Sequence, residues 1–159
     1  MLVLVLGLVA CKSDSAKAKE GSANVITSRV LEDVTFSLPD GWTTSYEEDT
    51  DTRQFASSDG KAVRLERADE RYVASPDAFM RHLEPRFKGK LMTIERRKNV
   101  SSGFAVVLAI FASAKDSEPV RATFVVRELG SAWYSCWSEG TDDEAAQDQV
   151  IALCRSVRL

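Results

Sequence analysis

Histidine and cysteine are scarce in this chain, which has one histidine and three cysteines in 159 residues. Structural zinc sites are built from four such side chains, so pairing of two cysteines would leave too few ligands for a zinc set. A basic excess is also lacking, since the formal net charge is −3 and the isoelectric point is about 5.3. Nucleic-acid binding depends on lysine and arginine contacts to phosphate, so nucleic acid is not an expected partner.

Recognisable catalytic motifs are missing as well. The sequence contains neither a glycine-rich phosphate-binding loop nor a Gly-x-Ser-x-Gly nucleophile elbow. His82 is the sole histidine, and a lone helical histidine is far more often a surface side chain than a catalyst or a metal ligand. We therefore expect a protein that is not an enzyme and that carries no cofactor.

One acidic cluster invites comparison with a calcium loop. Residues 47–51, EEDTD, bring four carboxylates together. An EF-hand calcium loop also needs a glycine at its sixth position and a glutamate at its twelfth, and both are missing here. A solvated acidic loop is the better interpretation, and no metal site is predicted.

The chain contains no apolar run long enough to span a membrane, and the run near its start is short. Residues 2–10, LVLVLGLVA, are uncharged, whereas a helix that spans a bilayer needs about 20 apolar residues. The run fits the apolar core of an export signal, and Ala10 is the small residue required before the cut. With Cys11 it resembles the lipobox of bacterial lipoproteins, whose cysteine thiol is acylated. The resemblance implies that residues 1–10 are removed and that Cys11 carries the lipid.

Two further observations bear on this signal. Export signals normally begin with positive charge, but no lysine or arginine precedes the apolar run, so we expect the true start upstream of Met1. In the alternative interpretation, residues 2–10 form a buried strand and Cys11 is a core residue. The polar segment that follows at once favours the signal.

A flexible tether is expected after Cys11. Residues 12–24, KSDSAKAKEGSAN, lack aromatic and β-branched side chains and cannot bury enough surface to offset their ordering entropy. Acyl chains on Cys11 would hold the protein to a membrane without a spanning helix. Lys12 after the cysteine resembles enterobacterial sorting signals that direct lipoproteins to the outer membrane, facing the periplasm. The expected organisation is a signal (1–10), a lipidated cysteine with its tether (11–24) and a single domain (25–159).

Alternating apolar residues predict an antiparallel sheet. Val34, Phe36 and Leu38 alternate with polar residues, which predicts a strand that ends at the turn of residues 39–41, Pro-Asp-Gly. Further strands are expected at residues 54–57, 62–67, 104–112, 121–129 and 132–138. Asp59-Gly60 suits a tight hairpin between the first two of these, and the wholly apolar segment 104–112 predicts a strand covered on both faces.

Two helices are expected against this sheet, which makes the fold class α+β. Ser75-Pro76 combines a hydroxyl N-cap with proline at the first helical position, and Pro85 should kink or end the helix. Residues 141–144, Thr-Asp-Asp-Glu, match a capping box, which predicts Thr141 as the N-cap of the second helix. The apolar face of the first helix comprises Phe79, Leu83 and Phe87, and that of the second Ala146, Val150, Leu153, Cys154 and Val157.

The two remaining cysteines are expected to form a disulfide. With Cys11 assigned to lipid, Cys136 on the last strand and Cys154 on the last helix are left, and an exported compartment permits them to pair. The alternative is two buried free thiols, because cysteine is a common small core residue.

The order of these elements resembles the PsbP-like α/β/α sandwich. The resemblance is carried by the opening Leu38-Pro39-Asp40-Gly41-Trp42, a hairpin, a helix, a meander and a closing strand and helix that ends in Ser156-Val157. That superfamily includes many bacterial lipoproteins. Its members share helices packed on an antiparallel sheet while their functions differ, so the resemblance implies the fold and no activity.

The charges are distributed unevenly along the chain. Residues 32–59 carry eight acids and one base, whereas residues 61–100 carry eleven bases and six acids. The bases could form a face toward anionic lipid or an acidic partner, or the two segments could pair within the fold, which is the favoured interpretation. The candidate binding surface comprises Trp42, Trp133, Trp137, Arg64, Arg67, Arg96 and Arg97.

Two functions are consistent with these features. The first is a membrane-anchored, non-catalytic binding or accessory module for an envelope protein complex, and the alternative is a periplasmic carrier of a small ligand. A deep apolar cavity beside the sheet would favour the carrier. A flat exposed patch around the tryptophans would favour a protein partner.

Overall fold

The structure is a computed structural model that describes residues 30–112 and 118–159. The predicted signal, Cys11, the tether and the domain start at residue 25 lie outside the described residues. Within them, seven strands form one antiparallel sheet in the order β1-β2-β3-β7-β6-β5-β4. The strands are β1 (Trp42–Glu47), β2 (Thr52–Ser57), β3 (Ala62–Arg67), β4 (Leu91–Val100), β5 (Gly103–Phe111), β6 (Val120–Leu129) and β7 (Ala132–Glu139).

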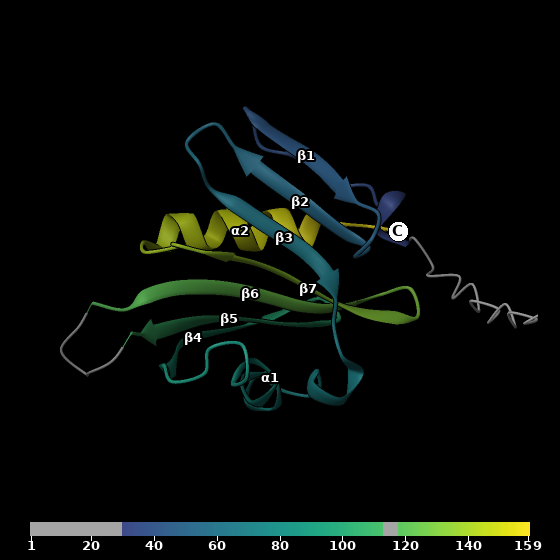
Figure 1. Cartoon of the computed structure of the whole chain (residues 1–159). Coiled ribbons are helices and arrows are strands. Elements are labelled where there is room, and N and C mark those ends of the chain that lie inside the picture. Colours follow the sequence, from purple (N-terminus) through teal and green to yellow (C-terminus); the bar gives the residue numbers. More distant parts are fainter. Residues whose placement is uncertain (1–29, 113–117) are drawn as a thin grey trace, which may run out of the picture.

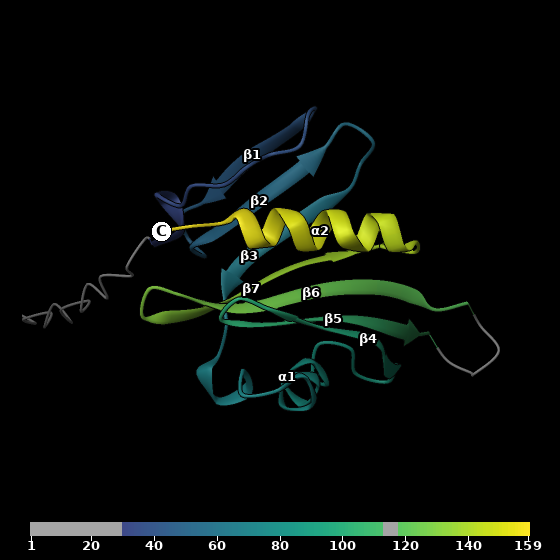
Figure 2. The ribbon, with the colours of Figure 1, turned by 180° about the vertical axis from the view of Figure 1, so that it is seen from behind.

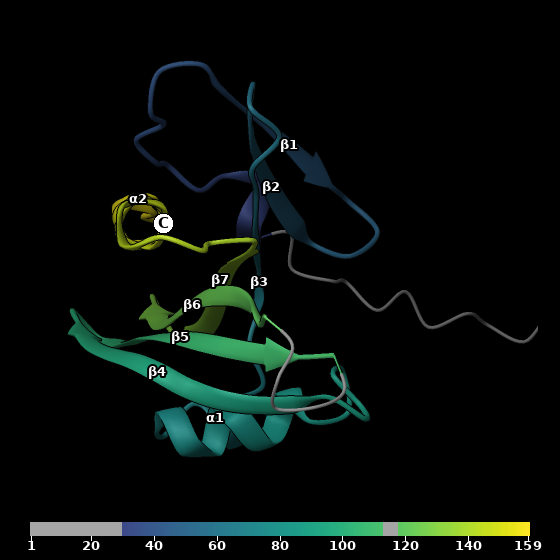
Figure 3. The same cartoon turned by 90° about the vertical axis from the view of Figure 1, so that its left-hand side faces the viewer.

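Helices cover both faces of this strongly twisted sheet. Helix α1 (Pro76–Leu83) lies on one face and α2 (Glu144–Ser156) on the other, as Figures 1 and 3 show from two directions. From behind, α2 runs across the strands in front of the viewer (Figure 2). Two short 3-10 helices complete the fold, η1 (Val30–Glu32) and η2 (Glu70–Tyr72). The predicted α+β class is confirmed. None of the described helices is long and apolar enough to cross a bilayer.

Each face of the sheet has its own hydrophobic core. Alternate residues of a strand point to opposite faces, so Val125 packs with Val150 of α2 while Phe124 and Val126 pack with Phe79 of α1. Strand β5 is buried at every position between its two ends, as expected for a strand with helices on both sides. The prediction that segment 104–112 is a strand covered on both faces is therefore confirmed.

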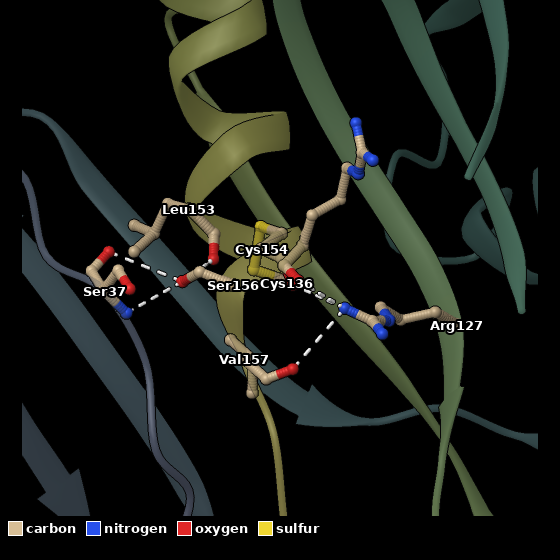
Figure 4. The surroundings of a disulfide bond; sticks show 8 residues. Ser37, Arg127, Cys136, Leu153, Cys154, Ser156 and Val157 are labelled. Atoms are coloured by element: carbon tan, nitrogen blue, oxygen red, sulfur yellow. Dashed lines mark hydrogen bonds between the residues drawn. A yellow bond between two sulfur atoms is a disulfide. The ribbon is translucent and has the colours of Figure 1, made fainter. Parts of the chain in front are cut away.

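A disulfide joins the sheet to α2. Cys136 on β7 and Cys154 on α2 are bonded, with a Cα–Cα distance of 5.7 Å, and Figure 4 shows the bridge behind the last turn of the helix. Both residues are 1% exposed. The bridge therefore lies within the core between α2 and the sheet.

Three sequence-based expectations need correction. Residues 34–38 do not form a strand, and only Thr35 is paired, as an isolated bridge to Arg158. Strands β1 and β4, which the sequence analysis missed, lie at the two edges of the sheet. Helix α2 is capped by Asp143, whose side chain accepts from the Ala146 backbone N–H at 2.7 Å, and Thr141 is not the cap.

Thr141 is drawn into the core instead. Its hydroxyl lies 2.8 Å from that of Thr123 on β6, and both residues are buried. A buried hydroxyl needs a partner, and Thr123 supplies one that the local sequence around Thr141 could not reveal. Asp143 then remains as the nearest acceptor for the first helical N–H groups.

Candidate functional site

A cavity of about 290 Å³ lies between α1 and the sheet. Its walls are Phe79 and Leu83 of α1 and Phe124 of β6, and its mouth carries charged side chains. Residues from β3 and β7 complete it. The lining residues are Glu66, Arg67, Ala68, Phe79, His82, Leu83, Pro85, Arg86, Phe124 and Ser135.

The local sequence sets the position of α1 over this cavity. The Ser75 hydroxyl accepts from the Ala78 backbone N–H at 3.2 Å, and Pro76 occupies the first helical position, so the predicted start is confirmed. The helix ends at Leu83, just before Pro85, because proline lacks the N–H of a further helical turn. In the first turn of the helix, Asp77 forms an ion pair with Arg97 of β4 at 2.8 Å.

Two aromatic residues of the cavity wall belong to a stack of three packed rings. Phe79 meets Phe124 edge-to-face with ring centroids 5.5 Å apart, and Phe124 stacks on Trp137 at 5.7 Å. These are preferred aromatic geometries, and each ring is at most 7% exposed. Phe79 and Phe124 line the cavity, and the aromatic packing continues behind them to Trp137 on β7, which does not line it.

A charged network closes one side of the mouth. Trp137 Nε1 donates to Glu66 Oε1 at 3.0 Å, and Arg86 Nη1 donates to the same oxygen at 3.4 Å. The Arg86 guanidinium also lies over the Trp137 ring, 4.0 Å from its centroid. Because Glu66 Oε1 already accepts from two donors, the unpaired charge at the mouth is that of Arg67. An apolar molecule with a neutral or anionic head fits this arrangement.

The three tryptophans do not form an exposed patch. Trp137 is 7% exposed and stacks on Phe124 behind the cavity, and Trp42 and Trp133 are half-buried against different cores. Among the described residues, the exposed large hydrophobic side chains are Leu91, Val120 and Leu159. The structure thus gives no support to a flat tryptophan surface.

The four arginines of the predicted binding surface are also dispersed. Arg64 and Arg67 lie on β3, which three other strands separate from Arg96 and Arg97 on β4. Arg64 pairs with Glu47 at 3.5 Å, and Arg96 pairs with Glu144 and Asp148 of α2 at 3.2 and 3.1 Å. Arg67 is exposed and has no ion pair among the described residues. Arg64 and Trp137 lie opposite each other on β3 and β7 and line one hollow, but the structure does not bring all seven predicted residues into one surface.

The acidic cluster at residues 47–51 serves the fold. Asp51 accepts from the Leu31 backbone N–H at 3.1 Å and from the Tyr46 hydroxyl at 2.9 Å, while Glu47 pairs with Arg64. Within residues 30–112 and 118–159 no group of three or more histidine, cysteine or acidic side chains could hold a metal ion. These carboxylates thus bind protein groups of their own chain.

Sequence reasoning missed the cavity although it identified parts of its wall. Phe79 and Leu83 were predicted as the apolar face of a helix, which is correct, but the gap beside them depends on Phe124 and Ser135 from distant strands. No local pattern predicts that these side chains leave space. A scan of family models finds no match to this chain, and no curated protein is significantly similar to it.

Proposed function

We propose that this chain is a lipid-anchored protein of the bacterial envelope whose domain is a non-catalytic binding module for a small amphipathic molecule. The observation that carries the binding role is the cavity of about 290 Å³ with aromatic walls and a charged mouth. Ligand sites are typically apolar cavities with a few convergent polar groups, and a dry apolar cavity of about half this volume can hold benzene. The absence of a tryptophan patch among the described residues supports the carrier over the protein-binding role.

The anchor and the fold family are parts of the same proposal. The anchor rests on residues 8–11, Leu-Val-Ala-Cys, and Lys12 favours the outer membrane facing the periplasm. The PsbP-like assignment is supported by the hairpin β2-β3, the meander from β4 to β7 and the closing helix α2, with helices on both faces of the sheet. Because members of that superfamily differ in function, the binding role depends on the cavity alone.

The experiment uses three probes that share one ring and differ in charge: benzoate, benzyl alcohol and benzylamine. Binding to the full chain is followed by NMR chemical-shift changes. We expect benzoate to bind more tightly than benzylamine, because Arg67 is unpaired at the mouth whereas Glu66 is already occupied by Trp137 and Arg86. The shifts should be confined to residues that line the cavity.

A filled cavity is the matched control. Ala68→Phe places a ring beside Phe79 and should abolish binding, while Ala56→Phe adds the same ring at an exposed position of β2 and should leave it unchanged. If none of the probes binds, or if Ala68→Phe binds as the wild type does, the cavity is not a ligand site.

A role as an accessory protein in an envelope complex is the second candidate. Strand β4 is an edge of the sheet, and its ten residues pair only with β5 among the described strands. Such an edge can accept a strand from a partner, although charges such as Arg97 and Lys98 usually protect edges from pairing. A photo-crosslinker at exposed Leu91 should capture a partner in intact cells if this role is correct, whereas one at Ala56 should not.

A further inference from the structure

Three arginines gather where α2 ends, on the face of the sheet opposite the cavity. Arg127 lies on β6, Arg155 in the last turn of α2 and Arg158 just after it. Nη1 of Arg127 donates to the Arg155 carbonyl at 2.9 Å, and Nη1 of Arg158 donates to the same oxygen. Figure 4 shows Arg127 beside the end of the helix, with a dashed line to the Val157 carbonyl. Two guanidinium groups therefore converge on one acceptor.

The end of the helix accounts for part of this arrangement. Carbonyl groups at a helix C-terminus lack partners within the helix and carry partial negative charge, about half an elementary charge for the whole helix. Arg127 also donates to the carbonyls of Cys154 at 3.4 Å and Val157 at 3.5 Å, so it caps this end. Three full positive charges exceed what the helix end can balance.

The described structure supplies no carboxylate to these three arginines. Other arginines are paired, such as Arg96 with Glu144 and Arg121 with Glu95 at 2.8 Å, but Arg127, Arg155 and Arg158 have no ion pair among the described residues. Burial, followed by the nearby charges of Arg158 and Arg155, lowers the pKa of Arg127. A like-charged cluster without a counterion is a favourable environment for an anion.

The Arg127 guanidinium has N–H donors that no group of the described protein uses. It is only 9% exposed, all its hydrogen bonds use Nη1, and its Nε is buried with no partner. Its Nη2 donates to no group of the described protein, so this donor is left for a partner in the space beside it. A hollow of about 460 Å³ lies against it, lined by Ser101, Arg127, Ala152, Arg155, Ser156 and Arg158.

We propose that this hollow binds a phosphate group, as a free phosphate or as the phosphodiester of a lipid headgroup. Phosphate offers several charged acceptor oxygens, and arginine binds such groups through two parallel hydrogen bonds. Three guanidinium groups and the Ser101 hydroxyl in the turn between β4 and β5 can surround them. A single carboxylate could neutralise only one of the three charges.

The position of the hollow connects it to the start of the domain. Thr35, near the start of the described chain, and Arg158 exchange two backbone hydrogen bonds of 2.8 Å, so the last residues of the chain lie next to its first described segment. If the tether leads from Cys11 to this end, the arginines can reach the membrane surface and a lipid headgroup is the natural source of phosphate. This step rests on the proposed lipid anchor, whereas the phosphate site itself does not.

The test measures binding of two water-soluble probes to the full chain by calorimetry: inorganic phosphate and glycerophosphoglycerol, a headgroup diester without acyl chains. We expect at least one of them to bind to the wild type. The double variant Arg155→Gln/Arg158→Gln should bind about tenfold more weakly or worse, since each removes a charge-assisted hydrogen bond. Both side chains belong to exposed residues, so the fold should be retained.

Arg81→Gln/Lys88→Gln is the control, because it removes the same charge from exposed residues of α1 and the loop after it. Binding of phosphate alone identifies a free phosphate as the source, and binding of the diester identifies a headgroup; each result supports the site. Failure of both probes to bind, or an equal loss in the control variant, overturns it. Neither probe needs acylated Cys11, so failure of the anchor and failure of the site are distinguishable.

Discussion

At the scale of single residues, Cys136 and Cys154 join β7 to the last helix from two fully buried positions. Replacing both with serine should lower the free energy of unfolding by about 2 to 5 kcal/mol, because the unfolded chain gains freedom and two hydroxyls become buried. Denaturant unfolding at equilibrium measures the loss. A double alanine variant separates the two causes, since it removes the bridge without burying a hydroxyl.

Thiol titration of the denatured, unreduced protein checks the same bridge directly. With Cys11 acylated, the mature chain should contain no titratable thiol. Two titratable thiols in oxidised protein would show that Cys136 and Cys154 are free, which is the alternative interpretation of the sequence.

Gly103 is required by the close approach of two strands. It opens β5 opposite Arg127 of β6, and a Cβ here would overlap the Val126 carbonyl oxygen and lie 2.7 Å from the Arg127 Cα. Backbone atoms of a paired strand cannot give way, so Gly103→Ala should destabilise the fold by about 3 kcal/mol. Gly60→Ala is the matched control, because it meets open space and costs only about 1 kcal/mol for its positive φ. Equal losses in the two variants would contradict the steric explanation.

At the scale of elements, two variants distinguish the candidate N-caps of α2, Asp143 and Thr141. Asp143→Ala should lower the free energy of unfolding by about 1 kcal/mol and speed hydrogen exchange at the Ala146 amide, because Asp143 caps that N–H. Thr141→Val should destabilise by about 1 to 3 kcal/mol without that local effect, because it leaves the buried Thr123 hydroxyl unpaired. If hydrogen exchange at the Ala146 amide is faster in Thr141→Val but not in Asp143→Ala, then Thr141 is the cap and Asp143 is not.

The elements that sequence reasoning identified have strong local signals. The hairpin β2-β3 follows from Asp59-Gly60, the start of α1 from Ser75-Pro76, and β5 from an uninterrupted apolar run. Strand β4 was missed because it is a half-exposed edge rich in charge, where packing on one side only leaves little apolar pattern. Residues 34–38 have the alternation of a strand but lie outside the seven strands, with a single bridge at Thr35.

The candidate sites were less predictable than the elements. Arg127 interrupts the apolar residues of β6 in phase with Val125, which faces α2, and this phase could have indicated a buried arginine. Its neighbours Arg155 and Arg158 come from the end of α2, so the cluster exists only after the helix packs. The same holds for the cavity, whose aromatic walls come from α1 and β6.

At the scale of the whole molecule, ion pairs balance part of the uneven charge along the chain. Acid-base pairs connect β4 to both helices, through Arg97 and Asp77 of α1 and through Arg96 and Glu144 of α2. The acidic segment 32–59 and the basic segment 61–100 are joined by two ion pairs, Arg64 with Glu47 and Lys61 with Asp59, which supports the favoured interpretation in part. Arg127, Arg155 and Arg158 lie outside this basic segment, have no ion pair among the described residues and line one hollow, so the phosphate site is proposed at the end of α2.

The placement of the molecule at a membrane depends on one residue, Cys11. Acyl chains contribute about 0.8 kcal/mol for each buried CH₂, so two or more chains anchor a protein durably, whereas the nine apolar residues 2–10 are too short to span a bilayer. Cys11→Ala should therefore move the protein from the detergent phase to the aqueous phase in a detergent partition of whole cells. The double serine variant of Cys136 and Cys154 is the control, since it keeps Cys11 and should remain in the detergent phase. An alanine variant that still partitions wholly with detergent would mean that something other than acylation at this cysteine holds the chain to the membrane, and the lipoprotein proposal would be wrong.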